Sequence, residues 1–354
     1  MHIVIPAAGK STRFPQMRPK WLLTHPNGQL MVVEALKGLP LASADTVTLV
    51  VLKKHIDEYG CLRGVRSAFR EAFPALRLTV VQLEEETKSQ PETVARAIET
   101  LGLRGPFFIK DTDNFFRAPL RPGNFVCTYR LDRTDRIRPG NKSYVTTKAD
   151  GSIDDIAEKR IIGHSFCAGG YGFESAEQFL ATFRRLEHSS DLYVSHIVYA
   201  MLLDGVRFLE TPVEAYLDWG TLDDWNRYKE GFATLFVDLD GVLVRNSSQF
   251  MHSAWGDTAA ISPNADYINR LYDSGKVRIV ITTARPKRFR RKTLRQLQRE
   301  GIKYHDILFG LPHAKRIVIN DFSGTNPFPS GVALNLRRDA PELEELLSGY
   351  LSRE

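Results

Sequence analysis

Short apolar runs alternate with longer amphipathic segments over roughly the first two thirds of the chain. Four such runs read as buried strands, at residues 3–5, 47–52, 78–83 and 106–109. Between them, residues 31–39, residues 62–73 and a segment beginning at Gln90 have the spacing of helices. Strands that alternate with helices predict an α/β domain whose mostly parallel sheet is covered on both faces. Ligands of such sheets bind beyond the carboxyl ends of the strands.

The same pattern restarts near residue 235, after a junction at residues 229–234. An apolar run there ends in Asp238, and later apolar runs lead into Thr283 and Asp321. A chain of 354 residues is too long for one typical core. We therefore predict two domains, residues 1–230 and residues 231–354.

The composition is that of an ordinary globular protein, with 43% apolar and 25% charged residues. No apolar run reaches the length of a transmembrane helix, and the chain enters its first strand without a leader, so a cytoplasmic location is expected. Cys61, Cys127 and Cys167 lie far apart, which favours neither a disulfide framework nor a zinc site. The net charge of +6 favours acidic ligands, either phosphorylated small molecules or nucleic acid.

The loop after the first strand combines small residues, hydroxyl groups and cations. Small residues let the backbone approach a ligand, and successive N–H groups in such a turn bind anions. Hydroxyl donors and two cations, the planar guanidinium of Arg13 and the ammonium of Lys20, suit a triphosphate. A solvated loop is the alternative. The residues of this predicted cradle are Ala7, Ala8, Gly9, Ser11, Thr12, Arg13 and Lys20.

Two further carboxylates, Asp111 and Asp113, follow the apolar strand that ends near Lys110. Oxygen ligands at a strand end suit Mg²⁺, which usually takes one or two carboxylates together with phosphate oxygens. The alternative is a pair of aspartates that form a turn. The sequence therefore predicts a magnesium site at this edge of the sheet.

These motifs resemble those of the nucleotidyltransferases that activate sugar phosphates and related phospho-alcohols. The residues that match the opening signature are Gly9, Thr12, Arg13, Pro19, Lys20 and Leu22, while Ser11 replaces the usual second glycine. The resemblance implies a mixed sheet covered by helices. It also implies that Asp113, with Asp111 in reserve, and Asp218 hold the metal. By the same resemblance, Gln90, Glu92 and Thr93 lie beside the nucleotide base; a plain helix start is the alternative for these three.

The resemblance extends to an acceptor site. Glu158 and Lys159 match a Glu-Lys-Pro motif that holds the hydroxyls and the phosphate of the acceptor, although Arg160 replaces the proline. Gly170 and Tyr171 match a Gly-x-Tyr-x-Phe strand that lines the acceptor pocket. A salt-bridged surface pair before a glycine-rich strand explains the same residues without a ligand.

In the second domain, a strand ends in Asp238, Asp240 and Gly241, and the glycine allows a sharp turn. This resembles the first motif of the haloacid-dehalogenase superfamily, and the later motifs follow in order. The resemblance implies that Asp238 attacks phosphorus and that Asp240 serves as acid and base. Thr283 (with Thr282 as second choice) and Lys315 would hold the phosphoryl group. Asp238, Asp240 and Asp321 would hold Mg²⁺. The short spacing of the motifs leaves no room for a large cap and implies a small, capless, Rossmann-like domain.

Together the two resemblances predict a bifunctional enzyme. Its partners would be a nucleoside triphosphate and a phosphorylated sugar, polyol or similar alcohol, with CTP as the first choice and UTP, GTP or dTTP open. Pyrophosphate would be released, and the second domain would hydrolyse a phosphomonoester, a pair of activities that suits surface-polysaccharide precursor synthesis. One alternative is a nucleic-acid end-processing phosphatase that uses the basic run 285–292, although we do not expect nucleic acid as a partner. Another is that one domain is catalytically silent and regulatory. The oligomeric state stays open.

Overall fold

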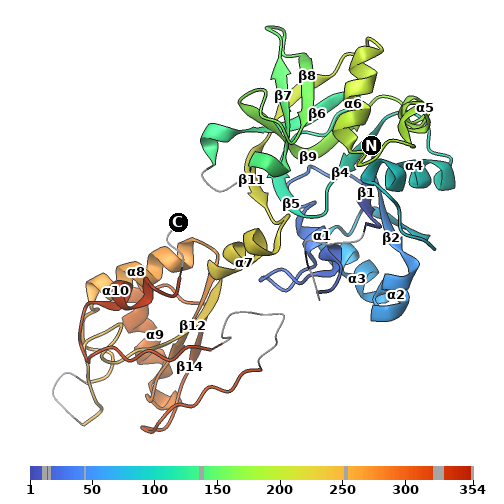
Figure 1. Ribbon diagram of the computed structural model, residues 1–354. Coiled ribbons are helices and arrows are strands. Elements are labelled where there is room, and N and C mark those ends of the chain that lie inside the picture. Colours follow the sequence, from blue (N-terminus) through green and yellow to red (C-terminus); the bar gives the residue numbers. More distant parts are fainter. Residues whose placement is uncertain are drawn as a thin grey trace. The chain divides into compact units, whose positions relative to one another are not determined.

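The computed structural model describes residues 1–9, 14, 17–43, 45–134, 139–250, 254–321 and 331–351 (Figure 1). The chain divides into two compact units, Met1–Trp225 and Asn226–Glu354. The sequence places the junction slightly later, at residues 229–234. None of the helices in the described ranges is long and apolar enough to cross a membrane.

The first unit is built on one large mixed sheet with the strand order β10-β6-β9-β4-β1-β2-β3. Strands β3, β2, β1 and β4 run parallel to one another, whereas β9 is antiparallel to β4, β6 and β7. The bounds are β1 (His2–Ala7), β2 (Thr46–Leu52), β3 (Arg77–Leu83), β4 (Phe107–Lys110), β6 (Phe125–Arg130), β7 (Ser143–Thr147), β8 (Ile153–Glu158), β9 (Ser165–Phe173) and β10 (Leu209–Pro212). The four parallel strands are those that the apolar runs predict.

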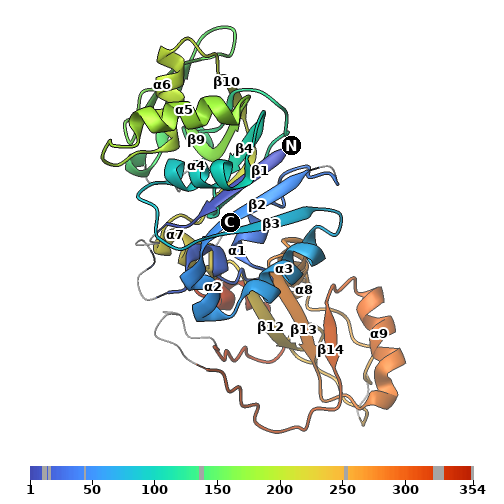
Figure 2. The ribbon, with the colours of Figure 1, turned by 90° about the vertical axis from the view of Figure 1, so that its right-hand side faces the viewer.

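Helices cover both faces of this sheet (Figure 2). Alternate residues of the central strands enter two separate cores, because successive side chains of a strand point to opposite faces. Ile3 and Ile5 pack with α1 (Met31–Glu34) and α3 (Leu62–Ala72), beside α2 (Lys53–Tyr59). Val4 and Val50 pack with α4 (Gln90–Leu101), α5 (Ala176–Leu186) and α6 (Val194–Leu203).

The helix predicted at residues 31–39 is regular only over α1, and turns follow it. Gly38 lies so close to the backbone of Phe116 that no Cβ would fit there. Helix α4 begins where the sequence predicts, because Ser89 caps it: the Ser89 hydroxyl accepts from the Glu92 N–H at 3.2 Å, and the Glu92 carboxylate accepts from the Lys88 N–H at 2.7 Å. The helix ends at Gly102, whose φ of +58° is left-handed.

A small second sheet brings together two segments that lie far apart in the sequence. Strand β5 (Asn114–Arg117) pairs antiparallel with β11 (Glu214–Asp218), so that Asp218 lies opposite Asn114. Helix α7 (Leu222–Glu230) follows. This pairing carries the end of β11 to the loop after β4.

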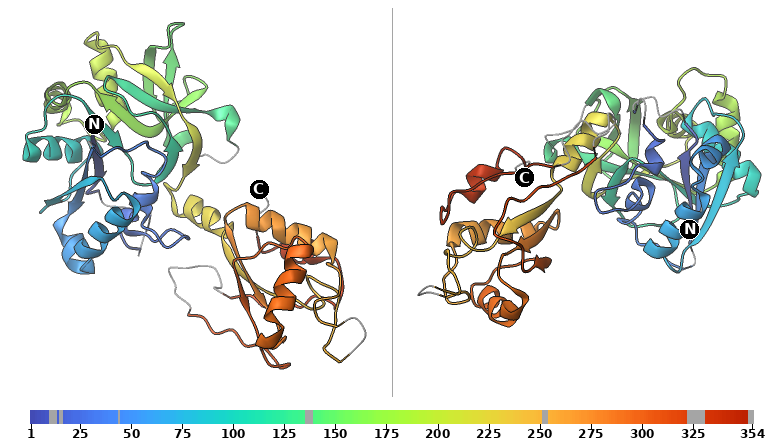
Figure 3. Two further views of the ribbon diagram at one scale, coloured as in Figure 1. Left: turned by 180° about the vertical axis from the view of Figure 1, so that it is seen from behind. Right: turned by 90° about the horizontal axis from the view of Figure 1, so that it is seen from below.

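The second unit contains a parallel sheet of three strands in the order β12-β13-β14, which are labelled in Figure 2. Figure 3 shows this unit, coloured yellow to red, from two further sides. Its elements are β12 (Ala233–Asp238), α8 (Ser262–Asp273), β13 (Val277–Thr282), α9 (Arg290–Arg299), β14 (Asp306–Leu308) and α10 (Leu343–Leu347). Short 3₁₀ turns in the two units are η1 (Lys20–Leu22), η2 (Leu131–Arg133), η3 (Pro139–Asn141) and η4 (Lys287–Phe289). Ile268 of α8, Leu297 of α9 and Leu343 of α10 share one core with the strands.

The strand predicted to end in Asp321 does not form. Residues 317–319 lie outside any strand, and Ile317, Val318 and Ile319 are 77%, 64% and 89% exposed. An apolar run becomes a strand only where a neighbouring strand accepts its hydrogen bonds. Among the described strands, β12 pairs only with β13, and none pairs with this run.

Gly169 of β9 is required by its backbone and its neighbours. Its φ is +83°, and an added Cβ would collide with the Asn114 amide and the Asp111 carboxylate. We expect Gly169→Ala to lower the free energy of unfolding by about 3 kcal/mol, because strain and overpacking add. Urea denaturation measures this loss. Gly151→Ala is the control, since Gly151 also has a positive φ but lies in open space, and about 1 kcal/mol is expected there. Equal losses at the two positions would contradict the collision.

Candidate functional site

The predicted triphosphate cradle is described only in part. Ala7 and Ala8 are buried at the carboxyl end of β1, and Gly9 is exposed. The predicted residues Ser11, Thr12 and Arg13 lie outside the described residues, as does Lys10. Their roles stay predictions.

Lys20 joins the two loops that carry the predicted metal ligands. Its ammonium donates to Asp113 Oδ2 at 2.8 Å and to the Gly220 carbonyl at 2.8 Å. The side chains of Lys20 and Asp113 are only 9% and 15% exposed. A cation held in this way keeps a partly buried carboxylate compensated and fixes its position.

The backbone places Asp113 and Asp218 side by side. Asn114 pairs with Asp218 in the β5–β11 ladder, and the Trp219 N–H donates to the Asp113 carbonyl at 2.9 Å. The Gly220 N–H donates to Asp218 Oδ1 at 3.0 Å and orients that carboxylate. The structure therefore brings together the two aspartates that the sequence predicts as metal ligands.

Lys142 is a functional candidate that the sequence did not reveal. Its ammonium is 2.5 Å from Asp218 Oδ2 and donates to the Tyr216 hydroxyl at 2.7 Å. Burial alone would lower the pKa of Lys142, but the interactions of its ammonium with Tyr216 and Asp218 outweigh burial and raise the pKa above its ordinary value. Lys142 is therefore a cation. Its contact with Asp218 could not be recognised from the sequence, because it depends on the pairing of β5 with β11.

A buried lysine shapes the loop that carries Asp111 and Asp113. The Lys110 ammonium donates to the carbonyls of Asp111 and Asn114 at 2.9 and 3.0 Å, and also to the Asn114 side chain. Burial lowers the pKa of Lys110 to about 8. Gln90 donates to the Asp111 carboxylate. Of the three residues predicted beside the base, Gln90 is thus the one that contacts this loop.

The other two residues predicted beside the base, Glu92 and Thr93, form hydrogen bonds at the start of α4. Thr93 is buried, and its hydroxyl lies 2.6 Å from that of Thr87 and 3.2 Å from the Ser89 carbonyl. Glu92 accepts from the N–H of Lys88, the residue before the N-cap Ser89. These contacts match the helix-start alternative for Glu92 and Thr93, while a role beside the base stays a prediction.

The predicted acceptor pair lies at the open end of the β7–β8 hairpin. The Glu158 carboxylate accepts from the Ser143 hydroxyl and, at 2.7 Å, from the Ser195 hydroxyl. Lys159 is exposed with a left-handed φ of +56°, and its ammonium donates to the Tyr193 hydroxyl at 2.5 Å. A non-glycine residue rarely adopts that backbone without a constraint. The pair is therefore held by hydroxyl groups and not by a surface salt bridge to each other.

Tyr171 and Gly170 lie on opposite faces of β9. Tyr171 is buried, and its pKa is raised first by burial and then by the nearby Cys167, Asp111 and Glu158. A Cβ on Gly170 would instead meet the rings of Phe108 and Phe116 in the core. Gly169, which the sequence did not single out, is the glycine that faces the acidic loop. Tyr171 is thus close to Glu158, a predicted acceptor residue, and to Asp111, whereas core rings fill the space beside Gly170. A role of either residue at the acceptor stays a prediction.

Asp111 makes the stability of the first unit depend on pH. Burial and then the charge of Asp113 raise the pKa of Asp111 to about 6. An unfolded aspartate ionises near pH 4, so between about pH 4 and pH 6 the folded state keeps a proton that the unfolded state has lost. The resulting stabilisation is present below about pH 4 and is lost as the pH rises through about 6.

Asp111→Asn removes this dependence. The free energy of unfolding of the variant minus that of the original chain should therefore increase by about 2 kcal/mol as the pH rises from 5 to 8. Urea denaturation of the metal-free protein at each pH measures the gain. The exposed Asp154 gives the control, Asp154→Asn, for which no gain is expected. The same gain in both variants, or none in Asp111→Asn, would contradict the assignment.

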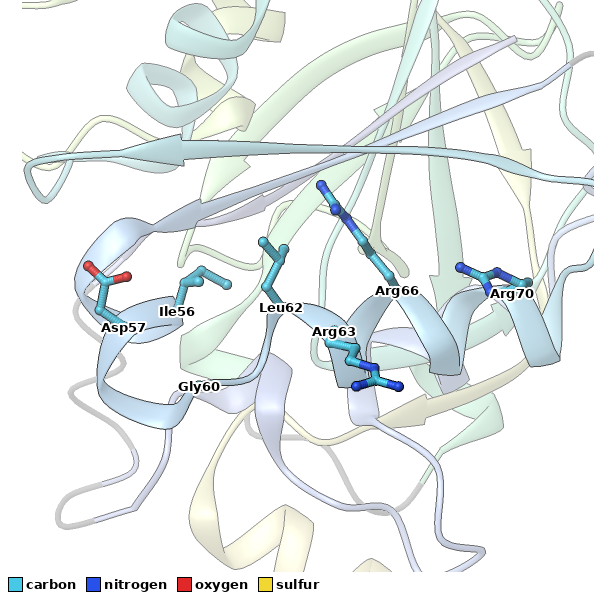
Figure 4. A pocket seen from close by; sticks show the side chains of 7 residues that line it. All are labelled: Ile56, Asp57, Gly60, Leu62, Arg63, Arg66 and Arg70. Atoms are coloured by element: carbon cyan, nitrogen blue, oxygen red, sulfur yellow. The ribbon is translucent and has the colours of Figure 1, made fainter.

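A cavity of about 650 Å³ lies beside α2 and α3, away from these loops. Figure 4 shows that the side chains of Arg63 and Arg66 point in different directions, so they do not converge on one anion. Its lining residues are Ile56, Asp57, Gly60, Leu62, Arg63, Arg66 and Arg70. The cavity adds nothing to the candidate site.

In the second unit, Asp238 and Asp240 lie at the carboxyl end of β12. Arg285 forms a bidentate ion pair with Asp240: its Nη2 and Nε donate to the two carboxylate oxygens of Asp240 at 2.7 and 2.9 Å. Arg285 is fully buried, and its Nη1 donates to Gln296 at 2.7 Å and Thr293 at 3.2 Å. Arg285, the first residue of the basic run, is therefore internal. The sequence did not indicate this, because the residue lies in a charged stretch.

The remaining predicted phosphatase residues are only partly gathered. Thr283 is buried, with its hydroxyl 3.5 Å from Asp240 Oδ2. Arg316, not the exposed Lys315, reaches Asp238, at 3.2 Å from Oδ1. Burial raises the pKa of Asp238 although Arg316 opposes it. Asp321 is exposed and follows the run that forms no strand.

The residues of the first unit fit a divalent cation better than those of the second. Among the described residues, no three histidine, cysteine, aspartate or glutamate side chains gather as a metal centre. Mg²⁺ often needs only one or two carboxylates, because substrate phosphates and water complete its ligands. Asp113 and Asp218 fit that pattern. Of the three ligands predicted in the second unit, Asp238 and Asp240 lie together at the end of β12, whereas Asp321 is exposed.

Solved structures match this chain. A nucleoside-diphosphate-sugar pyrophosphorylase from Vibrio cholerae RC9 superposes with a TM-score of 0.52 and 19% identity, over 64% of this chain and 98% of that chain. An apo UDP-glucose pyrophosphorylase superposes with a TM-score of 0.50 and 12% identity, over 63% of this chain and 94% of that chain. The first unit has the fold of these sugar-nucleotide pyrophosphorylases.

This pyrophosphorylase fold confirms the fold predicted for the first domain. No protein-family model matches the chain, and no curated protein matches it significantly. The haloacid-dehalogenase fold of the second unit stays a prediction that rests on its motifs.

Proposed function

We propose that the first unit transfers a nucleotidyl group from a nucleoside triphosphate to a phosphorylated sugar, polyol or similar alcohol and releases pyrophosphate. The observation that carries this proposal is the meeting of Asp113 and Asp218 through the β5–β11 ladder. The fold of the unit supports it. A site with two carboxylates and nearby lysines, beyond the ends of parallel strands, suits transfer between phosphates.

In this mechanism the acceptor phosphate supplies the nucleophile. Its oxygen attacks the α-phosphorus, the bond to the β-phosphate oxygen breaks, and pyrophosphate leaves with that electron pair. Lys20 and Arg13 offset the charge that develops on the phosphates. Mg²⁺ bound to Asp113 and Asp218 would supply further charge compensation. No protein nucleophile is needed.

The acceptor is proposed to bind at Glu158 and Lys159. The Glu158 carboxylate, oriented by Ser143 and Ser195, suits the hydroxyl groups of a polyol or sugar. The Lys159 ammonium suits its phosphate, to which it would turn from Tyr193. The side chain of Tyr171 is close enough to Glu158 for the two groups to interact electrostatically.

We propose that the second unit hydrolyses a phosphomonoester with the help of Mg²⁺. Asp238 would attack phosphorus while the bond to the ester oxygen breaks, and the alcohol would leave with a proton from Asp240, so that an aspartyl-phosphate forms. Asp240 would then take a proton from the attacking water, which releases phosphate and restores the Asp238 carboxylate. Thr283 and Lys315 are the proposed phosphoryl-binding residues. The placement of Asp238 and Asp240 at one strand end supports this assignment. The basic run gives the nucleic-acid alternative less support than its sequence suggests, because Arg285 is internal and Lys292 pairs with Asp257.

A substrate matrix tests the proposal. Each of CTP, UTP, GTP and dTTP is combined with common sugar and polyol phosphates, and both pyrophosphate and phosphate are measured. We expect one combination to release pyrophosphate at least about 100-fold faster than the others, only in the presence of both substrates and Mg²⁺. Pyrophosphate release from none of the combinations would overturn the transferase assignment. A pathway role in surface-polysaccharide precursors rests on the acceptor that this matrix identifies.

A further inference from the structure

The open end of the β7–β8 hairpin connects the two halves of the candidate site. Ser143 pairs with Glu158 in the ladder, and the Lys159 N–H donates to the Lys142 carbonyl at 2.9 Å. Lys142 is therefore the backbone neighbour of the predicted acceptor residue Lys159. Its side chain, however, extends to Asp218, a predicted metal ligand.

The surroundings hold the Lys142 ammonium in one position. It lies 5.4 Å from the ring centre of Tyr216 and 5.9 Å from that of Phe166, in addition to its contacts with Asp218 and the Tyr216 hydroxyl. The side chains of Lys142 and Asp218 are 15% and 14% exposed. Such a partly desolvated pair is strongly coupled, unlike a surface ion pair.

Asp113 and Asp218 thus each pair with a different lysine. Lys20 lies at Asp113 Oδ2, and Lys142 lies at Asp218 Oδ2. Asp218 Oδ1 meanwhile accepts from the Gly220 N–H. A divalent cation that binds Asp218 through Oδ2 must share that oxygen with the Lys142 ammonium or displace it, and two cations near one oxygen repel each other.

We propose that Lys142 is a positioning residue for Asp218 that competes with the divalent cation and joins the metal half of the site to the acceptor half. In the metal-free site it keeps Asp218 compensated and correctly oriented. When the cation binds, the displaced ammonium stands next to the predicted acceptor residue Lys159, where it offsets the charge of the acceptor phosphate. The competition rests on geometry alone, whereas the catalytic consequence rests on the proposed function.

Direct Mn²⁺ binding to the full chain without substrate tests the competition. The measurement is the electron paramagnetic resonance signal of free Mn²⁺, in an Asp238→Asn background that weakens any contribution from the second unit. We expect Lys142→Met to bind Mn²⁺ at least about tenfold more tightly than the parent, because an uncompensated carboxylate attracts the cation more strongly. Lys142→Arg should bind within about threefold of the parent, because it keeps the charge. A Lys142→Met affinity within about twofold of the parent would overturn the proposal.

Three further variants make this result specific. Lys148→Met, on the same hairpin but paired at the surface with Asp154, should leave the affinity unchanged. With Asp218→Asn added, Lys142→Met should no longer tighten binding, and a gain that persists would overturn the proposal. Tyr216→Phe removes only the second partner of the ammonium and should tighten binding by about two- to fivefold. If melting curves show that Lys142→Met does not fold, the Mn²⁺ affinity of Tyr216→Phe decides whether Lys142 competes with the cation.

Kinetics test the link to the acceptor half. We expect Lys142→Met to lower kcat for pyrophosphate release at least about 30-fold while KM for the triphosphate changes less than about threefold. Lys142→Arg should recover most of kcat, and an unchanged kcat in Lys142→Met would overturn the link. If the parent transfers no nucleotide to any acceptor, the proposed function fails, but the Mn²⁺ measurement still decides whether Lys142 competes for Asp218.

Discussion

Asp218→Asn is expected to lower the rate of pyrophosphate release about a thousandfold. The substitution keeps the size of the side chain and an oxygen for the Gly220 N–H, but it removes the charge that would bind a divalent cation. Loss of metal-assisted charge compensation costs several kcal/mol of transition-state stabilisation, and each 1.36 kcal/mol is tenfold in rate. Asp113→Asn should have an effect of the same size, because both carboxylates would hold one ion.

The rate is measured as pyrophosphate release at saturating triphosphate and acceptor. Asp154→Asn is the matched control, because Asp154 is an exposed aspartate of the same unit that pairs with Lys148, and it should keep the full rate. Melting curves show whether each variant is folded, which matters because Asp113→Asn removes a carboxylate that pairs with the buried Lys20. A folded Asp218→Asn variant that keeps more than about a tenth of the rate would contradict the assignment of Asp218.

Asp238→Asn is expected to abolish phosphate release, by about a thousandfold or more, and to leave pyrophosphate release unchanged. An amide cannot form the aspartyl-phosphate that the proposed hydrolysis requires. The two proposed activities are assigned to units that are compact in their own right, so a change at one strand end of the second unit should not alter pyrophosphate release by the first. The assay measures both products from the same preparation.

The exposed Asp273, which pairs with Lys303, provides the control Asp273→Asn in the same unit. This variant should keep both activities. Phosphate release that survives in Asp238→Asn would show that Asp238 is not the nucleophile. Loss of both activities in a folded Asp238→Asn variant would instead show that the two units act together.

The local pattern of the sequence was sufficient for the central strands. Continuous apolar runs such as residues 47–52 can hardly be anything other than strands buried on both faces. The start of α4 was equally predictable, because Ser89, Pro91 and Glu92 carry the signals of a capped helix. The run at 317–319 failed because an apolar pattern does not say which strand will accept it.

The site was predictable where a motif sits at the end of one strand, and not where distant segments meet. Asp113 and Asp218 could be named from motifs, but their pairing depends on the register of β5 with β11. Lys142 and Arg285 were missed for that reason, since a charged residue in a polar stretch is normally solvated. Only the fold shows that each is turned inward onto an aspartate.

The central claim is that Asp113 and Asp218 hold one divalent cation in the first unit. Crystals of the full chain grown with Mn²⁺ and a non-hydrolysable triphosphate analogue test it through anomalous diffraction. The account predicts an anomalous peak about 2.2 Å from one oxygen of each carboxylate, with phosphate oxygens completing the ligands. A manganese peak bound to the triphosphate but to neither aspartate would contradict it.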